Sequence, residues 1–194
     1  MKDWVGNASV RNCNLRTAQA EKNDYYATEP RAVELLLEQE EFSPCVWECA
    51  CGEGHMSKVL EQHGYTVMST DLIDRGYGVG GVDFLKVTKE DAEDGVQWDI
   101  ITNPPYKYAK EFVEHALEIS EDGTKIAMFL KLTFLEGKGR RDLFRNNPPQ
   151  TIYVSSARLQ CGKNGVFDGA SMVAYAWFVW KKGHTGPTNI KWIN

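Results

Sequence analysis

Residues 45–71, CVWECACGEGHMSKVLEQHGYTVMSTD, decide the fold that the sequence predicts. CVWEC is a short apolar run typical of a buried strand, and YTVMSTD forms a second such run. MSKVLEQHG between them has helical spacing and closes on Gly64, a residue suited to the left-handed conformation that often ends a helix. The order strand, helix, strand predicts a βαβ unit with parallel strands.

Strands and helices alternate through most of the remaining chain. We expect helices within DYYATEPRAVELLLEQEEF, KEFVEHALEIS and GRRDLFRNN, and strands at VQWDIIT, KIAMFLKL, TIYVSS and SMVAYAWFVW. In the first helix Thr28 is the expected N-cap and Pro30 lies in the first turn. This alternation predicts an α/β fold whose mostly parallel sheet has helices on both faces. Only the loop RLQCGKNGVFDGA separates the last two strands, so we expect them to pair antiparallel.

The composition limits the domain organisation and the partners. The chain has 194 residues, 42% of them hydrophobic, which suits one domain at 24–194 behind a polar arm at 1–23. It lacks a membrane-length apolar run and the apolar centre of a secretion signal, so we expect a cytoplasmic protein. A net charge of −5 argues against a broad nucleic-acid footprint, although a local basic patch is compatible with it. The five cysteines, an odd number without a matching second ligand pair, predict neither a disulfide framework nor a metal site.

The turn inside the βαβ unit has the features of a nucleoside site. Glu48 ends the first strand, and Gly52 and Gly54 permit tight turning and close approach of the backbone to a ligand. The second strand ends at Asp71, where an acid accepts hydrogen bonds from ribose hydroxyls in dinucleotide folds. The alternative is a turn whose glycines serve geometry alone.

The charges around this turn favour a cationic nucleoside over NAD. Ser57 stands where the dinucleotide fingerprint has its third glycine, and the Lys-Ser/Thr pair of a phosphate-binding loop is missing. The acidic residues of the turn would repel a pyrophosphate, whereas S-adenosylmethionine carries a sulfonium, an ammonium and no phosphate. Asp83 could accept the adenine amino group and Phe84 could cover the base. The alternative for this pair is a strand-end acid and a core phenylalanine.

A second motif, Asn103-Pro104-Pro105-Tyr106, follows the strand VQWDIIT. The Asn103 side-chain oxygen and the Pro104 carbonyl could each accept a hydrogen bond from one N–H of a planar amino group. These two hydrogen bonds would draw the nitrogen, which is a weak nucleophile, towards a tetrahedral shape. The prolines restrict the backbone, so the two acceptors are preorganised. Tyr106 offers a face on which a flat ring could stack. The alternative is a strand terminator with a surface tyrosine.

Five stretches, DYYATEP, WECACGEG, STD, VDF and NPPY, together resemble the small adenine-N6 DNA methyltransferases of phages and prophages. The resemblance covers about residues 24–194. It implies a Rossmann-like class I methyltransferase fold, with a seven-stranded sheet in which one strand is antiparallel and without a separate target-recognition domain. It further implies S-adenosylmethionine as the cofactor and DNA as the partner, with the adenine flipped out or single-stranded, in the cytoplasm of a bacterium or a phage-infected host.

Matching the motifs residue by residue gives the implied site. The catalytic residues are Asn103, Pro104, Pro105 and Tyr106. The cofactor-binding residues are Tyr26, Thr28, Glu48, Cys49, Ala50, Gly52, Gly54, Asp71, Leu72, Asp83, Phe84 and Asn103. The candidates for substrate contacts are the basic residues Lys107, Arg140 and Arg141. We expect His55 and His63 to be structural.

Other functions share these motifs. Enzymes that methylate RNA or a glutamine amide on a protein also use Asn-Pro-Pro-Tyr, because a glutamine amide presents the same flat amino group. A non-catalytic binding module on this fold is a further alternative, since a fold does not determine a function. The intact Asn-Pro-Pro-Tyr motif argues against a non-catalytic module. The resemblance favours adenine in DNA over RNA or a protein glutamine.

Overall fold

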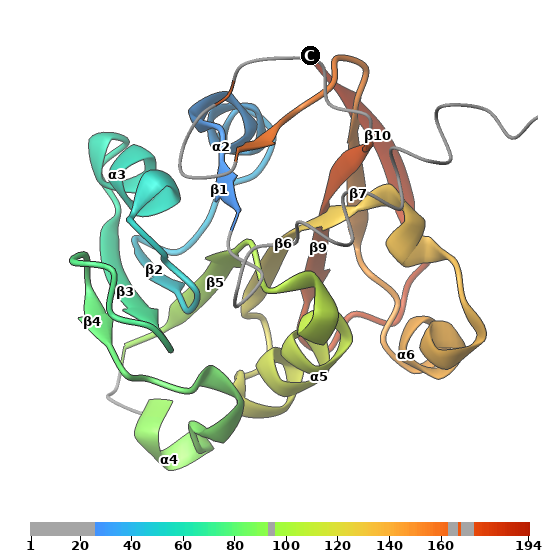
Figure 1. The fold of residues 1–194 in the computed structure, drawn as a ribbon. Coiled ribbons are helices and arrows are strands. Elements are labelled where there is room, and N and C mark those ends of the chain that lie inside the picture. Colours follow the sequence, from blue (N-terminus) through green and yellow to red (C-terminus); the bar gives the residue numbers. More distant parts are fainter. Residues whose placement is uncertain (1–25, 93–95, 163–166, 168–172) are drawn as a thin grey trace, which may run out of the picture.

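The computed structural model describes residues 26–92, 96–162, 167 and 173–194 (Figure 1). The expected arm at 1–23 and most of the loop at 163–172 therefore lie outside the described residues. Within the described part, eight strands form one sheet in the order β10-β7-β9-β6-β5-β2-β3-β4, and β1 pairs with β8 separately. None of the helices described is long and apolar enough to cross a membrane.

The bounds of the elements are as follows. The strands are β1 (Ala27–Thr28), β2 (Cys45–Glu48), β3 (Thr66–Asp71), β4 (Val79–Gly80), β5 (Trp98–Thr102), β6 (Lys125–Lys131), β7 (Thr151–Ser155), β8 (Cys161–Gly162), β9 (Tyr175–Lys181) and β10 (Asn189–Ile193). The α-helices are α2 (Pro30–Leu37), α3 (His55–Gln62), α4 (Lys89–Ala92), α5 (Ala109–Ile119) and α6 (Arg141–Asn146). Four short 3-10 helices are η1 (Phe84–Lys86), η2 (Tyr106–Tyr108), η3 (Leu132–Leu135) and η4 (Lys138–Arg140).

The sheet is mostly parallel, as the sequence predicts. β9 runs antiparallel to both of its neighbours, β6 and β7, while every other pairing in this sheet is parallel. The βαβ unit at 45–71 is β2, α3 and β3, and Gly64 after α3 has a φ of 88°, the left-handed conformation expected there. β3 lies on one side of β2 and β5 on the other, so the chain order reverses at β2.

The expectation of seven strands is corrected by β10, which adds an eighth at the edge of the sheet. It pairs parallel to β7, with Ile190 beside Ile152 and Trp192 beside Val154. Four of its five residues are exposed and only Ile193 is buried. The segment is short, and its alternating apolar residues Ile190 and Trp192 are exposed rather than packed in the core, so the sequence alone does not show that it pairs with β7.

The expected N-cap of the first helix, Thr28, is wrong. α2 begins at Pro30, and the preceding residue, Glu29, is extended with φ −63° and ψ 141°. A residue before proline is driven out of the helical region by the proline ring, so the helix cannot begin earlier. Thr28 instead belongs to β1, where it pairs with Cys161 of β8.

Two apolar layers cover the two faces of the sheet. β9 supplies both: Trp177 and Val179 pack with residues of α2 and α3, while Ala176, Phe178 and Trp180 pack with residues of α5 and α6. Burying one large apolar side chain contributes about 1.5–3 kcal/mol relative to leaving it in water. The central strands are therefore fixed from both sides, and their carboxyl ends are held in constant relative positions.

Candidate active site

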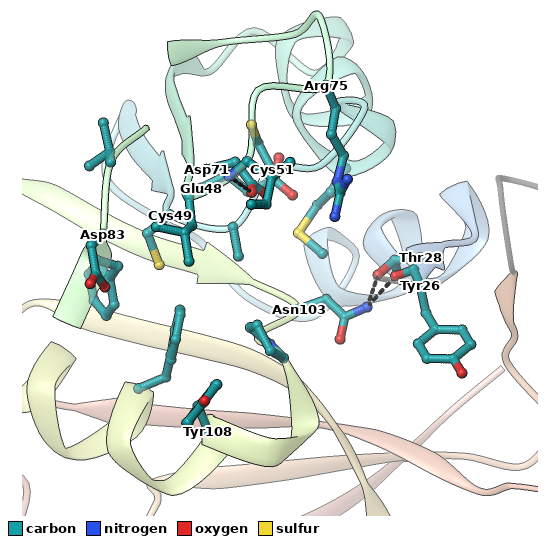
Figure 2. A pocket seen from close by; sticks show the side chains of 18 of the residues that line it. Tyr26, Thr28, Glu48, Cys49, Cys51, Asp71, Arg75, Asp83, Asn103 and Tyr108 are labelled. Atoms are coloured by element: carbon teal, nitrogen blue, oxygen red, sulfur yellow. Dashed lines mark hydrogen bonds between the residues drawn. The ribbon is translucent and has the colours of Figure 1, made fainter. Parts of the chain in front are cut away.

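A cavity of about 760 Å³ opens at the carboxyl ends of β2, β3 and β5 (Figure 2). This is the point where the strand order reverses, and open α/β sheets bind their ligands in the crevice at such points. All of the predicted cofactor residues line it except Gly52 and Gly54. The βαβ unit, the turn after β3, η1 and the β5–α5 segment thus meet around one space.

Gly52 and Gly54 shape the turn between β2 and α3. Their φ angles are 57° and 75°, in the left-handed region that favours glycine. At Gly54 a Cβ atom would lie 2.4 Å from the Tyr77 ring, so a side chain there is excluded by contact as well as by conformation. The turn can therefore bring its backbone close to the cavity, as the sequence predicts for a glycine pair.

Asp71, at the end of β3, braces this turn. Its Oδ2 accepts a hydrogen bond from the Gly52 backbone N–H at 2.8 Å, and its Oδ1 accepts one from the Ile73 N–H at 2.8 Å. An ionised carboxylate has about four acceptor sites, so both oxygens retain capacity for a ligand hydroxyl. Asp71 therefore joins β3 to the glycine turn and still faces the cavity.

Of the acids that line the cavity, Glu48 is the one whose pKa is shifted most from its ordinary value. Only 3% of it is exposed. Its carboxylate accepts a hydrogen bond from the Ser57 hydroxyl, which lies 2.7 Å from the Ser69 hydroxyl. Burial raises the pKa of Glu48 to about 8, against the lowering effect of the Ser57 hydrogen bonds. Ser57, noted in the sequence only because a glycine is missing there, therefore supports the acid that the motif depends on.

In the wall formed by η1, Phe84 is packed in the core. It is 2% exposed, with its ring centroid 5.2 Å from that of Trp47 and 5.0 Å from that of Phe112. It also lines the cavity, so its contact with the cofactor stays a prediction. The exposed apolar surfaces of the lining come instead from Leu72 and Tyr108, which are 57% and 43% exposed.

Asn103 follows β5 directly and has a fixed amide. Its Nδ2 group donates to the backbone carbonyl of Tyr26 at 3.0 Å and to the hydroxyl of Thr28 at 2.9 Å (Figure 2). Its Oδ1 is turned away from these two acceptors, is buried, and has no hydrogen-bond partner among the described residues. A buried amide oxygen without a donor is costly, and a ligand N–H group would satisfy it.

The structure separates the four residues of the Asn-Pro-Pro-Tyr motif. Asn103 and Pro105 line the cavity, whereas the described lining includes neither Pro104 nor Tyr106. The Tyr106 ring stacks against that of Tyr26, with centroids 6.3 Å apart and planes at 19°. Its hydroxyl oxygen lies 2.9 Å from the sulfur of Cys161, and burial raises the pKa of Tyr106 well above its ordinary value. Tyr106 is therefore packed against Tyr26 and Cys161.

The predicted substrate-contact residues fall into two groups. Lys107 lines the cavity, while Arg140 and Arg141 lie outside the described lining. Arg140 turns back on its own loop, donating to the carbonyls of Phe134 at 2.7 Å, Thr133 at 3.2 Å and Glu136. Its guanidinium therefore closes a turn, whereas Arg141, the first residue of α6, is exposed.

Sequence reasoning missed several residues of the lining. Arg75 points into the cavity from the loop after β3 (Figure 2). His55, expected to be structural, also lines the cavity, and burial lowers its pKa. Both directly flank the predicted motifs, one after the glycine turn and the other four residues beyond Asp71, and that proximity was the only available signal. Within the described residues no group of three His, Cys, Asp or Glu side chains could share a metal ion.

Among known proteins, no family model matches the chain and no curated protein matches it. Solved structures do match. A modification subunit assigned to a type I restriction enzyme of Vibrio vulnificus has a TM-score of 0.59 at 15% identity, over 93% of this chain and 48% of that one. The present chain thus spans about half the length of that subunit.

Two further structures match over most of their own length. A protein assigned as a class I S-adenosylmethionine-dependent methyltransferase from Listeria monocytogenes has a TM-score of 0.53 at 10% identity, over 94% of this chain and 71% of that one. A protein assigned as an RNA methyltransferase from Pyrococcus horikoshii has a TM-score of 0.58 at 15% identity, over 89% of this chain and 98% of that one. The chain thus has the Rossmann-like fold of class I methyltransferases.

Proposed function

We propose that the protein transfers a methyl group from S-adenosylmethionine to the N6 amino group of adenine in DNA. The observation that carries this proposal is the amide of Asn103: its contacts with Tyr26, Thr28 and Cys161 all use the nitrogen, which leaves the buried oxygen of this cavity-lining residue without a partner among the described residues. An amino group on a flat ring can donate to that oxygen.

The lining suits the proposed cofactor. The acids Glu48 and Asp71 suit its ammonium and its ribose hydroxyls. Leu72 and Tyr108 suit the faces of an adenine ring, with Asp83 as an acceptor for the adenine amino group. Arg75 is the candidate to pair with the carboxylate of the methionine part. When bound, this cofactor supplies a methyl group on a sulfonium.

The motif residues then act on the incoming amino group. Asn103 Oδ1 and the Pro104 carbonyl each accept a hydrogen bond from one of its two N–H groups. These hydrogen bonds direct the nitrogen lone pair towards the methyl carbon. As the N–C bond forms and the S–C bond breaks, the nitrogen gains positive charge, and a proton then leaves to solvent. Tyr106 stacks the base, which takes the place of the Tyr26 ring that now stacks against it.

The choice of DNA rests on the resemblance of the motifs and on two basic residues. Lys107 lies in the lining, and Arg141 is an exposed cation on α6. Among the fold neighbours, one is a modification subunit of a type I restriction enzyme and another is assigned as an RNA methyltransferase. Adenine in RNA is therefore the second candidate, with the same atom attacked.

Parallel transfer assays test the proposal. Labelled S-adenosylmethionine is incubated with duplex DNA, single-stranded DNA, RNA and glutamine-containing peptides, and the modified nucleosides or residues are separated by mass spectrometry. We expect label in DNA, as N6-methyldeoxyadenosine, and none with an Asn103→Ala variant that still binds the cofactor. Label confined to RNA or peptide would show that RNA or protein, rather than DNA, is the substrate. Cofactor binding without transfer to any of the four would refute the enzymatic proposal.

A further inference from the structure

We propose that Thr28 is a positioning residue for methyl transfer, whose hydroxyl holds the Asn103 amide with its oxygen towards the substrate. This proposal rests on the proposed function. The motif that the sequence presents is a contiguous tetrapeptide, but the structure supplies a part of its machinery from β1, which lies far from it in the chain. Thr28, expected to contact the cofactor, is thereby given a different role.

The contacts at the Asn103 nitrogen determine which way the amide faces. A carbonyl oxygen only accepts hydrogen bonds, so the Tyr26 carbonyl, 3.0 Å from Nδ2, favours the amide nitrogen at that position and disfavours the amide oxygen. The Thr28 hydroxyl, 2.9 Å from the same nitrogen, accepts the second N–H bond. Rotating the amide by half a turn would break the bond to Tyr26 and place two oxygens in contact. The Asn103 oxygen is therefore directed to the other side.

The Thr28 hydroxyl is itself held in place by the fold. Thr28 is 3% exposed, and it pairs with Cys161 in the two-stranded sheet of β1 and β8. The Glu29 N–H donates to the carbonyl of Gln160 at 3.2 Å, which extends this pairing by one residue up to the start of α2. A buried hydroxyl on a strand is costly unless it has a partner, and the Asn103 amide is that partner.

A valine at position 28 is the decisive substitution, because it keeps the shape of threonine and removes only the hydroxyl. In Thr28→Val the amide nitrogen keeps its hydrogen bond to the Tyr26 carbonyl and its long contact with the Cys161 sulfur at 3.7 Å, but it loses its short side-chain acceptor, so the amide samples orientations in which its oxygen is misdirected. We expect the kcat for methyl transfer to fall about tenfold or more, with the Kd for S-adenosylmethionine within about twofold of wild type. Thr28→Ser, which restores the hydroxyl, should recover most of the lost kcat.

Two controls separate positioning from folding. Thr66→Val makes the same change at an exposed position of β3 and should leave both constants at their wild-type values. Thermal unfolding of each variant identifies any general loss of structure. A wild-type kcat in Thr28→Val, or a defect confined to the Kd of the cofactor, would overturn the proposal.

A second experiment, which needs no substrate, tests the contact between Thr28 and Asn103. In protein labelled with 15N at asparagine side chains, the Asn103 amide signal is identified by its loss in Asn103→Asp. We expect its protons to exchange slowly with water in wild type and in Thr28→Ser, and about tenfold faster or more in Thr28→Val. Wild-type exchange as fast as that of an exposed asparagine would overturn the positioning role. Slow exchange without methyl transfer to any substrate would instead refute the proposed function alone.

Discussion

The side-chain nitrogen of Asn103 lies 2.9 Å from the hydroxyl oxygen of Thr28, although 75 residues separate the two in the chain. The contact joins the end of a central strand to a two-residue strand at the edge of the cavity. It engages the amide nitrogen of Asn103 and leaves Oδ1 as a buried acceptor without a partner among the described residues. The chemistry proposed for this site depends on that polarity.

Replacing Asn103 should abolish transfer while sparing the cofactor. In Asn103→Ala the acceptor is lost, and the rate constant for transfer should fall by about 10²–10³-fold, the usual effect of removing one preorganised polar group from an active site. The Kd for S-adenosylmethionine, measured by calorimetry, should change by less than about threefold. Near-normal turnover would contradict the role of the amide oxygen.

The Asn103→Asp variant tests the contacts of the Asn103 amide through the pH dependence of activity. At pH 8 an ionised carboxylate would face the Tyr26 carbonyl and the Thr28 hydroxyl, so the variant should be as inactive as Asn103→Ala. Protonation restores a donor towards Tyr26, and the relative activity of this variant should therefore rise as the pH falls. A pH profile parallel to that of wild type would contradict this explanation.

Glu48 should couple stability to pH. Its pKa is about 8 in the folded protein, whereas a glutamate in an unfolded chain titrates near ~4.3. Between these values the native state holds a proton that the unfolded state has released, so the free energy of unfolding falls as the pH rises through that window. The fall is on the order of a few kcal/mol. Urea unfolding at pH 5.5 and 8.5 should show a larger loss for wild type than for Glu48→Gln, and equal losses would contradict the assignment.

The same carboxyl should couple cofactor binding to proton release. A bound ammonium or sulfonium favours the ionised acid, so binding at pH 7 should release close to one proton. Calorimetry in two buffers of different ionisation enthalpy measures that number directly. In Glu48→Gln the release should vanish and the affinity should fall about tenfold. Release that persists in the variant would assign the proton to another group.

Two glycines provide a matched test of the turn. Gly54→Ala places a Cβ atom 2.4 Å from the Tyr77 ring at a φ of 75°, whereas Gly64→Ala has a φ of 88° with nothing within 4 Å. Gly64→Ala should lower the free energy of unfolding by about 1 kcal/mol through conformation alone. Gly54→Ala should cost about 1–3 kcal/mol more and weaken cofactor binding. Equal losses in urea unfolding would show that the Tyr77 contact is readily relieved.

Arg140 and Arg141 should separate stability from DNA binding. Arg140→Ala removes hydrogen bonds to three carbonyls of its own loop and should lower the melting temperature. Arg141→Ala should leave the melting temperature near wild type and weaken DNA binding, with the slope of log K against log salt reduced by about 1. Fluorescence anisotropy at several salt concentrations measures the slope, and an unchanged slope would remove Arg141 from the DNA interface.

The sequence predicts the local parts of this structure and misses the parts that depend on distant contacts. The unit from Cys45 to Asp71 is predicted because its strands, its helix and its two glycines follow one another within a single supersecondary motif. Asn103 is likewise placed by the strand that precedes it. These elements need no information from the rest of the chain.

Other features have no local signal. The polarity of the Asn103 amide depends on β1, and β1 is fixed by β8, which is more than a hundred residues away. The position of the Tyr106 ring likewise depends on contacts with Tyr26 and Cys161. The sequence predicts Phe84 either as a cofactor contact or as a core residue, and the fold places it both against Trp47 and Phe112 and in the lining of the cavity.

The position of β9 between β6 and β7 has a consequence for synthesis of the protein on the ribosome. β6 and β7 are made first, but neither pairs with the other, and both wait for residues 175–181. Until then the nascent chain exposes an open edge of KIAMFLK, five consecutive residues of which are buried in the finished sheet. A chain interrupted before Tyr175 therefore carries an unprotected, aggregation-prone strand, and the sheet becomes continuous only after residues 175–181 have been made.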